Sequence, residues 1–194
     1  MIRSIVVGYL IGSIPSADAI ARLRGHDLRA SGTGNPGTAN ALRVGGRLTA
    51  TIVLLVDLAK GAAAALAGDA FAGVGGSIAG GVFAIAGQVL SPWYRFKGGK
   101  GLGVTGGVTA VVWPPGLLVT LPLIAISAKV LRAAGGALVG LAAYLTGTVI
   151  WAANGWSTWW GVPPDDRLVW CGLGVVLLTA PKFIGDLSRR RYES

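Results

Sequence analysis

The stretch LTATIVLLVDLAKGAAAALAG, residues 48–68, decides the class of fold. A helix needs about 20 predominantly apolar residues to cross the hydrocarbon core of a membrane. This stretch has that length, and its ionisable residues are Asp57 and Lys60. It shows no alternation of polar and apolar residues of the kind that marks a half-buried strand. We therefore predict a membrane-spanning helix here.

The whole chain has the same character. It has 194 residues, of which 53% are hydrophobic and 13% are charged, with 32 glycines and a mean hydropathy of +0.64. Such a composition is too apolar for an ordinary soluble domain. Because backbone groups in lipid must satisfy one another, long apolar runs are expected to be helical. We expect an all-α, polytopic membrane protein forming a single integral membrane domain over residues 1–194.

Seven apolar runs are candidate transmembrane helices. The fourth and fifth are short and are separated by a turn at Trp113-Pro114-Pro115-Gly116. Abundant glycine and alanine predict close helix packing around the second and third runs. The runs are residues 2–21, 48–68, 70–90, 102–113, 116–128, 136–153 and 167–181.

Basic residues gather in alternate connections between these runs. The chain carries 17 Lys and Arg against 8 Asp and Glu, and this excess follows the positive-inside pattern of membrane insertion. Seven spans then place the N-terminus outside and the C-terminus in the cytoplasm. Trp156, Trp159 and Trp160 are interpreted as interfacial anchors on the outer face. Nucleic acid is not expected as a partner, because no face combining aromatic and basic residues accompanies the charge. The single cysteine, Cys171, can form no internal disulfide and is expected in the core or facing lipid.

Two glycine-rich loops fall on the predicted cytoplasmic side. One is GHDLRASGTGNPGTANALRVGG, residues 25–46, and the other is RFKGGKGLGVTGG, residues 95–107. Glycines at this density allow backbone N–H groups to converge on an anion, while Lys and Arg supply positive charge. The pair predicts a phosphate site at the membrane surface, although such loops also occur as plain basic connectors. Neither loop is a Walker A motif, because Lys100 is followed by Gly101 and not by Ser or Thr.

Asp57 and Lys60 lie three residues apart in an apolar helix and therefore share a face. Ionisable residues at such a depth mark function as a rule, although a purely structural ion pair is the alternative. In the first loop, Asn35 and Asn40 flank Gly37 and could brace the loop or bind a hydroxyl. Arg43 follows three residues later, on the first turn expected of the next helix.

At these residues the chain resembles the bacterial acyl-phosphate:glycerol-3-phosphate acyltransferases. The family pattern is G-x-D-L-R-x-x-G-S-G-N-x-G-x-T-N-x-x-R-x-x-G. This chain meets it, with Thr33 in place of Ser, at Gly25, Asp27, Leu28, Arg29, Gly32, Gly34, Asn35, Gly37, Asn40 and Arg43. The D-x-x-K-G element is met at Asp57, Lys60 and Gly61. The F-K-G-G-K-G element is met in full from Phe96 to Gly101. Three ordered motifs covering most of the chain make this a specific resemblance.

The resemblance implies transfer of a fatty acyl group from acyl phosphate to the sn-1 hydroxyl of glycerol 3-phosphate, with release of inorganic phosphate. It implies an enzyme of phospholipid synthesis in the bacterial plasma membrane, with a cytoplasmic active site and no cofactor or metal. Its partners would be acyl phosphate, glycerol 3-phosphate, membrane lipid and an enzyme that produces the acyl phosphate. By motif position, the catalytic residues would be Thr33, Arg43 and Lys100. The substrate-binding residues would be Asn35, Gly37, Asn40, Asp57, Lys60, Lys97, Gly98, Gly99 and Gly101.

The chain departs from the family pattern at two places. Gly87-Gln88 stands where the family has Gly-His, and Ser91 replaces a proline. Near the C-terminus, Pro181-Lys182-Phe183-Ile184 lacks the His and Asn of the family. Two alternatives therefore stay open. One is an inactive paralogue that binds phosphate or lipid. The other is a small transporter of a phosphorylated solute gated by Asp57 and Lys60, although no internal repeat supports it.

Overall fold

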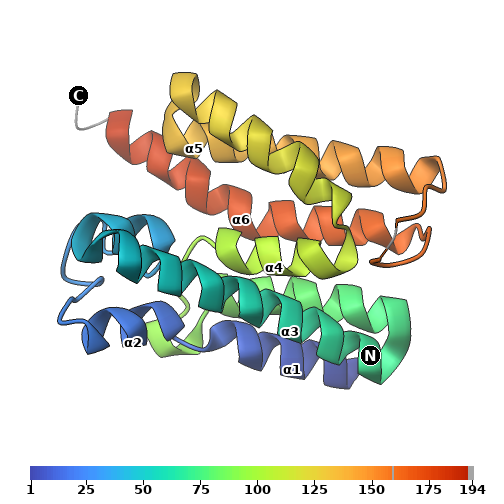
Figure 1. Cartoon of the computed structure of the whole chain (residues 1–194), viewed down its shortest axis with the longest axis horizontal. Coiled ribbons are helices and arrows are strands. Elements are labelled where there is room, and N and C mark those ends of the chain that lie inside the picture. The colour runs from blue at the N-terminus through green and yellow to red at the C-terminus, as the bar shows by residue number, and fades with distance from the viewer. Residues whose placement is uncertain (159, 192–194) are drawn as a thin grey trace. The chain divides into compact units, whose positions relative to one another are not determined.

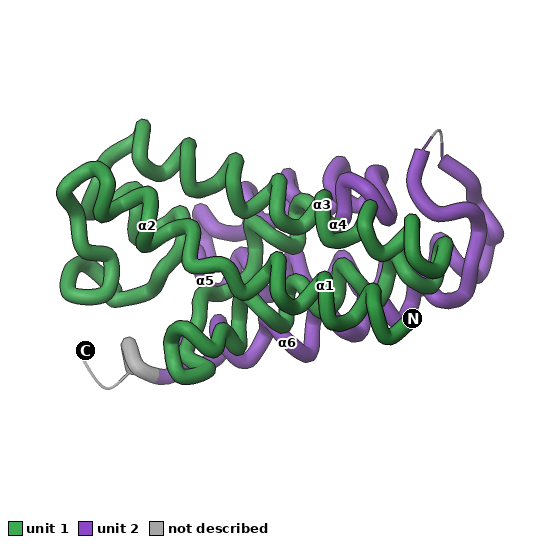
Figure 2. The backbone as a smooth tube through the Cα atoms, turned by 90° about the horizontal axis from the view of Figure 1, so that it is seen from below, with its two compact units in different colours: residues 1–108 green, residues 109–194 purple. Residues whose placement is uncertain are grey.

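The computed structural model describes residues 1–158 and 160–191, where the regular secondary structure is helical and contains no strand (Figure 1). The chain divides into two compact units, residues 1–108 and 109–194 (Figure 2). The predicted all-α class is confirmed. The elements are α1 (Ile2–Ser13), α2 (Ser16–Leu23), α3 (Thr38–Val89), the 3-10 turn η1 (Pro92–Tyr94), α4 (Leu102–Val112), α5 (Pro115–Ala153) and α6 (Arg167–Arg191).

Four helical ranges are long and apolar enough to cross a membrane. They are Ile2–Leu23, Thr38–Tyr94, Pro115–Ala153 and Arg167–Ser188, and α4 is a shorter apolar helix. The second and third ranges have 57 and 39 residues, whereas one crossing takes about 20. Each is interrupted by backbone that is not helical.

These interruptions fall close to the predicted connections. In α3 the helical dihedrals are lost at Ala72 and at Gly73, which has φ 57°. The break therefore lies a few residues beyond the one expected near residue 69, at a glycine that adopts positive φ at little cost. In α5 the break is at Arg132, with φ 60°, inside the predicted connection.

The prediction of one continuous helix over residues 2–21 was wrong. The run is split into α1 and α2 at Ile14 and Pro15, where Ile14 has φ −53° and ψ 125°. Proline lacks an N–H and disfavours helical backbone in the residue before it. The predicted end at residue 181 was also wrong, because α6 continues through Pro181 to Arg191.

Small residues hold the helices of the first unit close together. A Cβ on Gly8 would overlap the backbone of Gly80, and a Cβ on Gly68 would overlap that of Gly76. The Ser4 hydroxyl donates to the Gly68 carbonyl over 3.3 Å. Thus α1 lies along α3, and the two halves of α3 fold back on each other (Figure 1). The predicted close packing of small residues is confirmed.

The second unit has an aromatic core. The Trp113 ring packs edge-on against Tyr144 at 5.3 Å and against Trp151 at 6.0 Å. Cys171 is buried, with its sulfur 3.8 Å from the Tyr144 hydroxyl, so it is a core residue and does not face lipid. Trp156 and Trp160 are half exposed, as anchors would be, whereas Trp159 lies outside the described residues.

Candidate active site

The first glycine-rich loop connects α2 to α3 and is built around Asn40. The Asn40 side chain is buried. Its Oδ1 accepts the backbone N–H of Thr33 at 2.8 Å. Its Nδ2 donates to the carbonyls of Leu28 and Ser31, at 2.8 and 3.1 Å. The amide is thus engaged inside the loop, and Asn40 shapes the loop from beneath.

Glycines let this loop pass close over Asn40. Gly32 and Gly34 have φ of 63° and 67°, a region that side chains with a Cβ rarely enter. A Cβ on Gly32 would also overlap the Asn40 amide oxygen. Thr33, between the two glycines, is exposed, while Asn35 and Gly37 are partly buried.

Asp27 fixes the entry to the loop. Its Oδ1 accepts the backbone N–H groups of Arg29 and Ala30, at 2.8 and 3.0 Å. The hydrogen bonds from Ala30 and then Arg29 hold the pKa of this exposed carboxyl below its ordinary value. The loop ends at Thr38, where α3 begins, and Arg43 lies exposed on the first turns of that helix, as predicted.

The second glycine-rich loop is held by its backbone. Gly98 and Gly99 donate their N–H groups to the carbonyls of Val89 and Gln88, each at 3.0 Å. Both glycines are buried, and a Cβ on Gly98 would overlap the Gln88 backbone. Lys97 is exposed, Lys100 is partly buried, and Gly101 has φ 81° immediately before α4.

The structure brings the two loops together. Arg29 Nη1 donates to the Lys97 carbonyl at 3.3 Å. A Cβ on Gly99 would come within 3.0 Å of the Pro36 carbonyl oxygen. Each loop leads into the N-terminus of a helix, where backbone N–H groups lack acceptors within the helix and the helix dipole is positive. Helix N-termini, positive-φ glycines and adjacent cations together suit the binding of an anion such as phosphate.

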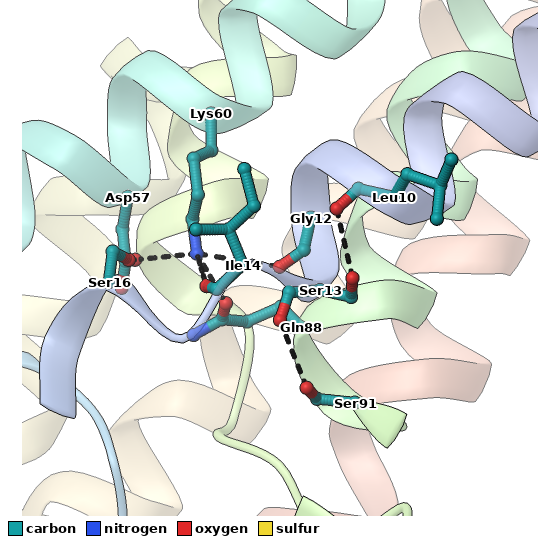
Figure 3. A network of polar contacts seen from close by, with 9 residues as sticks. All are labelled: Leu10, Gly12, Ser13, Ile14, Ser16, Asp57, Lys60, Gln88 and Ser91. Carbon is teal, nitrogen blue, oxygen red and sulfur yellow. Dashed lines mark hydrogen bonds and ion pairs between the residues drawn. The ribbon is translucent and has the colours of Figure 1, made fainter. Parts of the chain in front are cut away.

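Asp57 and Lys60 form a buried ion pair inside the first unit (Figure 3). Lys60 Nζ lies 3.2 Å from Asp57 Oδ1 and donates to the carbonyls of Ile14 and Gly12, at 2.9 and 3.4 Å. The Ser16 hydroxyl donates to Asp57 at 3.2 Å. The pair therefore satisfies carbonyls at the end of α1, where Pro15 interrupts the helix. These contacts favour the structural alternative and give no support to a transport gate.

Gln88 and Ser91, the departures in this region, are part of the same network. Gln88 Oε1 accepts a hydrogen bond from Lys60 at 2.7 Å, and the Ser91 hydroxyl donates to the Ser13 carbonyl at 3.0 Å (Figure 3). The Gln88 carbonyl also receives the Gly99 N–H. Gln88 thus links the buried ion pair to the second loop, a role that the sequence did not reveal. The other departure, residues 181–184, lies on α6 in the second unit, where Phe183 is buried.

Arg29 was named in the sequence analysis only as part of the first motif, without a role, and Tyr94 was not named there. The Arg29 guanidinium lies 4.6 Å from the centre of the Tyr94 ring. The contact between them could not be predicted, because nothing in the sequence around Arg29 indicates a tyrosine that is distant in the chain. Within the described residues, no group of three or more His, Cys, Asp or Glu side chains could hold a metal ion.

The long apolar helices define a helical membrane protein, and its paired glycine loops have a geometry that suits an anion. The model of the glycerol-3-phosphate acyltransferase family matches residues 2–189. A glycerol-3-phosphate acyltransferase of Maricaulis maris (strain MCS10) is 38% identical over 173 residues, covering 88% of this chain and 75% of the relative. One of Rhodopseudomonas palustris (strain BisB5) is 36% identical over 164 residues, covering 84% and 79%.

Solved structures agree in fold. The crystal structure of PlsY (YgiH), an integral membrane glycerol 3-phosphate acyltransferase, in its glycerol 3-phosphate form, superposes with a TM-score of 0.77 at 24% identity. That match covers 99% of this chain and 92% of the other. The lysophosphatidic acid form of PlsY gives 0.76 at 21% identity. The present chain belongs to the glycerol-3-phosphate acyltransferase family and is an acyltransferase.

Proposed function

We propose that the chain transfers a fatty acyl group from acyl phosphate to the sn-1 hydroxyl of glycerol 3-phosphate, giving lysophosphatidic acid and inorganic phosphate. The observation that carries this proposal is the meeting of two glycine loops, each ending at a helix N-terminus. Two such anion-binding elements match a reaction in which both substrates carry phosphate. The names of the relatives and the PlsY complexes support glycerol 3-phosphate as the acceptor.

The two loops bind different substrate groups. Thr33 on the first loop and Arg43 on the first turns of α3, together with Lys100, bind substrate phosphate. Asn35 and Gly37 line the first loop. Lys97, with the backbone of Gly98, Gly99 and Gly101, holds the acyl-phosphate headgroup. Asn40 acts by shaping the first loop. Asp57 and Lys60 act by fixing the helices beneath the second loop.

The reaction needs positioning and charge neutralisation more than a covalent intermediate. The acceptor hydroxyl oxygen forms a bond to the acyl carbonyl carbon, and the bond from that carbon to the phosphate oxygen breaks. A phosphate oxygen of the donor takes the hydroxyl proton, so inorganic phosphate leaves with it. Fixed cations and N–H groups stabilise the charge that develops. The single histidine of the chain, His26, is then not needed as a base, so His26→Ala should retain most of the turnover.

We further propose seven membrane spans in a single integral domain, with the N-terminus outside and both loops in the cytoplasm of a bacterial cell. Within the first unit, basic residues gather on the two loops and beside them, which fits the positive-inside rule. In a Cys171→Ala background, Ser31→Cys should react with an impermeant maleimide after permeabilisation of the cells. Ser157→Cys should react in intact cells, and the reverse pattern would refute this orientation.

The decisive experiment is phosphate release by the purified protein in lipid nanodiscs, with palmitoyl phosphate and glycerol 3-phosphate. Release should need both substrates and give lysophosphatidic acid. Lys100→Ala should lower the rate about 10²- to 10³-fold, the range for loss of one group that stabilises developing charge. Lys129→Ala, which removes the same charge from an exposed position on α5, is the matched control. Folded wild-type protein that releases no phosphate would favour an inactive paralogue.

A further inference from the structure

Arg29 contacts both glycine loops at once. Its Nη1 donates to the Gly34 carbonyl in the first loop at 3.5 Å and to the Lys97 carbonyl in the second at 3.3 Å. Its own backbone N–H is fixed by Asp27. The side chain is exposed, so these contacts are not a consequence of burial in a core.

Tyr94 provides the surface on which Arg29 rests. The guanidinium lies over the ring at 4.6 Å from its centre, a cation–π distance. Tyr94 ends η1 and immediately precedes Arg95 and Phe96, both with positive φ, which turn the chain into the second loop. The ring therefore marks the start of that loop.

The Tyr94 hydroxyl is buried and, in the part of the chain that the structure describes, makes no hydrogen bond. The side-chain contact that Tyr94 makes at the site is thus the stacking of its ring with Arg29. A chain of contacts runs from Tyr94 through Arg29 to the Lys97 carbonyl.

We propose that Arg29 is a positioning residue that sets the separation of the two glycine loops. It holds the Lys97 carbonyl and the Gly34 carbonyl on one planar group, which is stacked on Tyr94. Arginine suits this task, because its guanidinium can stack and direct several N–H groups in one plane, whereas lysine presents a flexible point charge. This inference rests on the proposed function, in which each loop holds one of the two phosphate-bearing substrates.

The kinetic consequence differs from that of a substrate-binding residue. When Arg29 is removed, each loop keeps its own binding groups, but the two substrates lose their mutual alignment. Misplacement by about 1 Å can lower a rate about 100-fold. Arg29→Gln should therefore lower kcat about 100-fold and change KM for glycerol 3-phosphate less than about threefold. Arg29→Lys should recover less than a tenth of the lost rate, because charge alone does not restore the stacked geometry.

A double-mutant cycle tests whether Arg29 acts through the tyrosine ring. Tyr94→Leu removes the ring and should lower kcat about tenfold or more, whereas Tyr94→Phe keeps the ring and should lower it less. The double variant Arg29→Gln with Tyr94→Leu should be no slower than Arg29→Gln, since partners in one interaction are not additive. Additive losses would overturn the proposed coupling. A rise in KM at unchanged kcat would overturn the positioning role.

A readout independent of turnover separates this inference from the proposed function. In detergent, a lysine-specific protease cuts after Lys97 at a rate set by how firmly that peptide is held. Arg29→Gln should raise this rate at least fivefold. Arg24→Gln is the matched control, because Arg24 Nε donates to Thr49 Oγ1 at 2.8 Å and has no such contact with the second loop. Equal cleavage rates in wild type and Arg29→Gln would overturn the inference. If the wild-type protein forms no product but Arg29→Gln is still cleaved faster, the proposed function alone is refuted.

Discussion

The charged residues of the first unit fall into two groups that are held in opposite ways. Arg43 and Lys97 are exposed on or beside the glycine loops. Asp57 and Lys60 are buried, and their charged atoms contact each other, helix-end carbonyls, Ser16 and Gln88. The contrast teaches that a charge at membrane depth is not by itself a mark of chemistry. A charge whose hydrogen bonds are met within the fold is held by the fold, and an exposed charge beside a glycine loop is open to an anion from outside.

The largest expected effect tests the buried group. Lys60→Met should lower the free energy of unfolding by about 3 to 5 kcal/mol, because removing one partner leaves Asp57 buried and uncompensated. The carbonyls of Gly12 and Ile14 lose the Lys60 ammonium as a donor as well, and Ile14 keeps the backbone N–H of Ser16. Denaturant titration in mixed micelles measures the loss. A Lys60→Met protein of wild-type stability but without activity would break the comparison, since Lys60 would then belong with the catalytic charges.

Asn40→Ala should have the next largest effect. It sharpens the comparison because Asn40 belongs to the loop region, but its replacement should lower stability as the replacement of buried Lys60 does. The Thr33 N–H and the carbonyls of Leu28 and Ser31 lose their partner, at about 1 to 3 kcal/mol for each buried group that stays unpaired. Stability and turnover should fall together. Asn35→Ala is the control, with a small change in stability expected at its partly buried position. Loss of turnover at unchanged stability in Asn40→Ala would mean that the amide meets substrate.

Gly99→Ala should act on the spacing of the loops with a smaller effect. The added Cβ would lie 3.0 Å from the Pro36 oxygen and 3.2 Å from Gln88 Nε2, so one neighbour must move by a few tenths of an ångström. We expect kcat to fall about tenfold, with a stability loss of about 1 kcal/mol. Gly185→Ala in α6, where nothing lies within 4 Å of the added carbon, should leave both unchanged. Equal activity of the two variants would argue against close loop contact.

The smallest effect concerns Asp27 and pH. Its pKa in the folded protein is lowered by hydrogen bonds from the N–H groups of Ala30 and Arg29. A lowered pKa contributes stability above the ordinary value near 3.8, and this contribution is lost as the pH falls through the folded value. Asp27→Asn should therefore be slightly less stable than wild type at pH 7, where the charge-assisted hydrogen bonds are missing, and should show a flatter loss of stability below about pH 4, where the two proteins converge. Thermal unfolding from pH 3 to pH 7 measures it, and parallel curves for both proteins would contradict this assignment.

The sequence predicted well those features that depend on local pattern. Apolar runs placed the helices, and the prolines at positions 114 and 115 placed the turn between α4 and α5. Glycine density identified both loops. The interruption at Ile14 and Pro15 was missed although Pro15 is a local signal for it, whereas the Lys60 contacts at this point could not be read from the sequence. The stacking of Arg29 on Tyr94 and the link through Gln88 could not be predicted either, because each joins segments that are far apart in the chain.

The break after α1 also has a consequence for biosynthesis. The Ile14 carbonyl accepts the backbone N–H of Ser16 and also the ammonium of Lys60, a residue made 46 residues later. Lys60 in turn donates to the Gln88 amide, 28 residues further on. The ribosome therefore makes the first helix before the side chains that complete the contacts at its end. Those contacts are complete only when the chain has been made through residue 88.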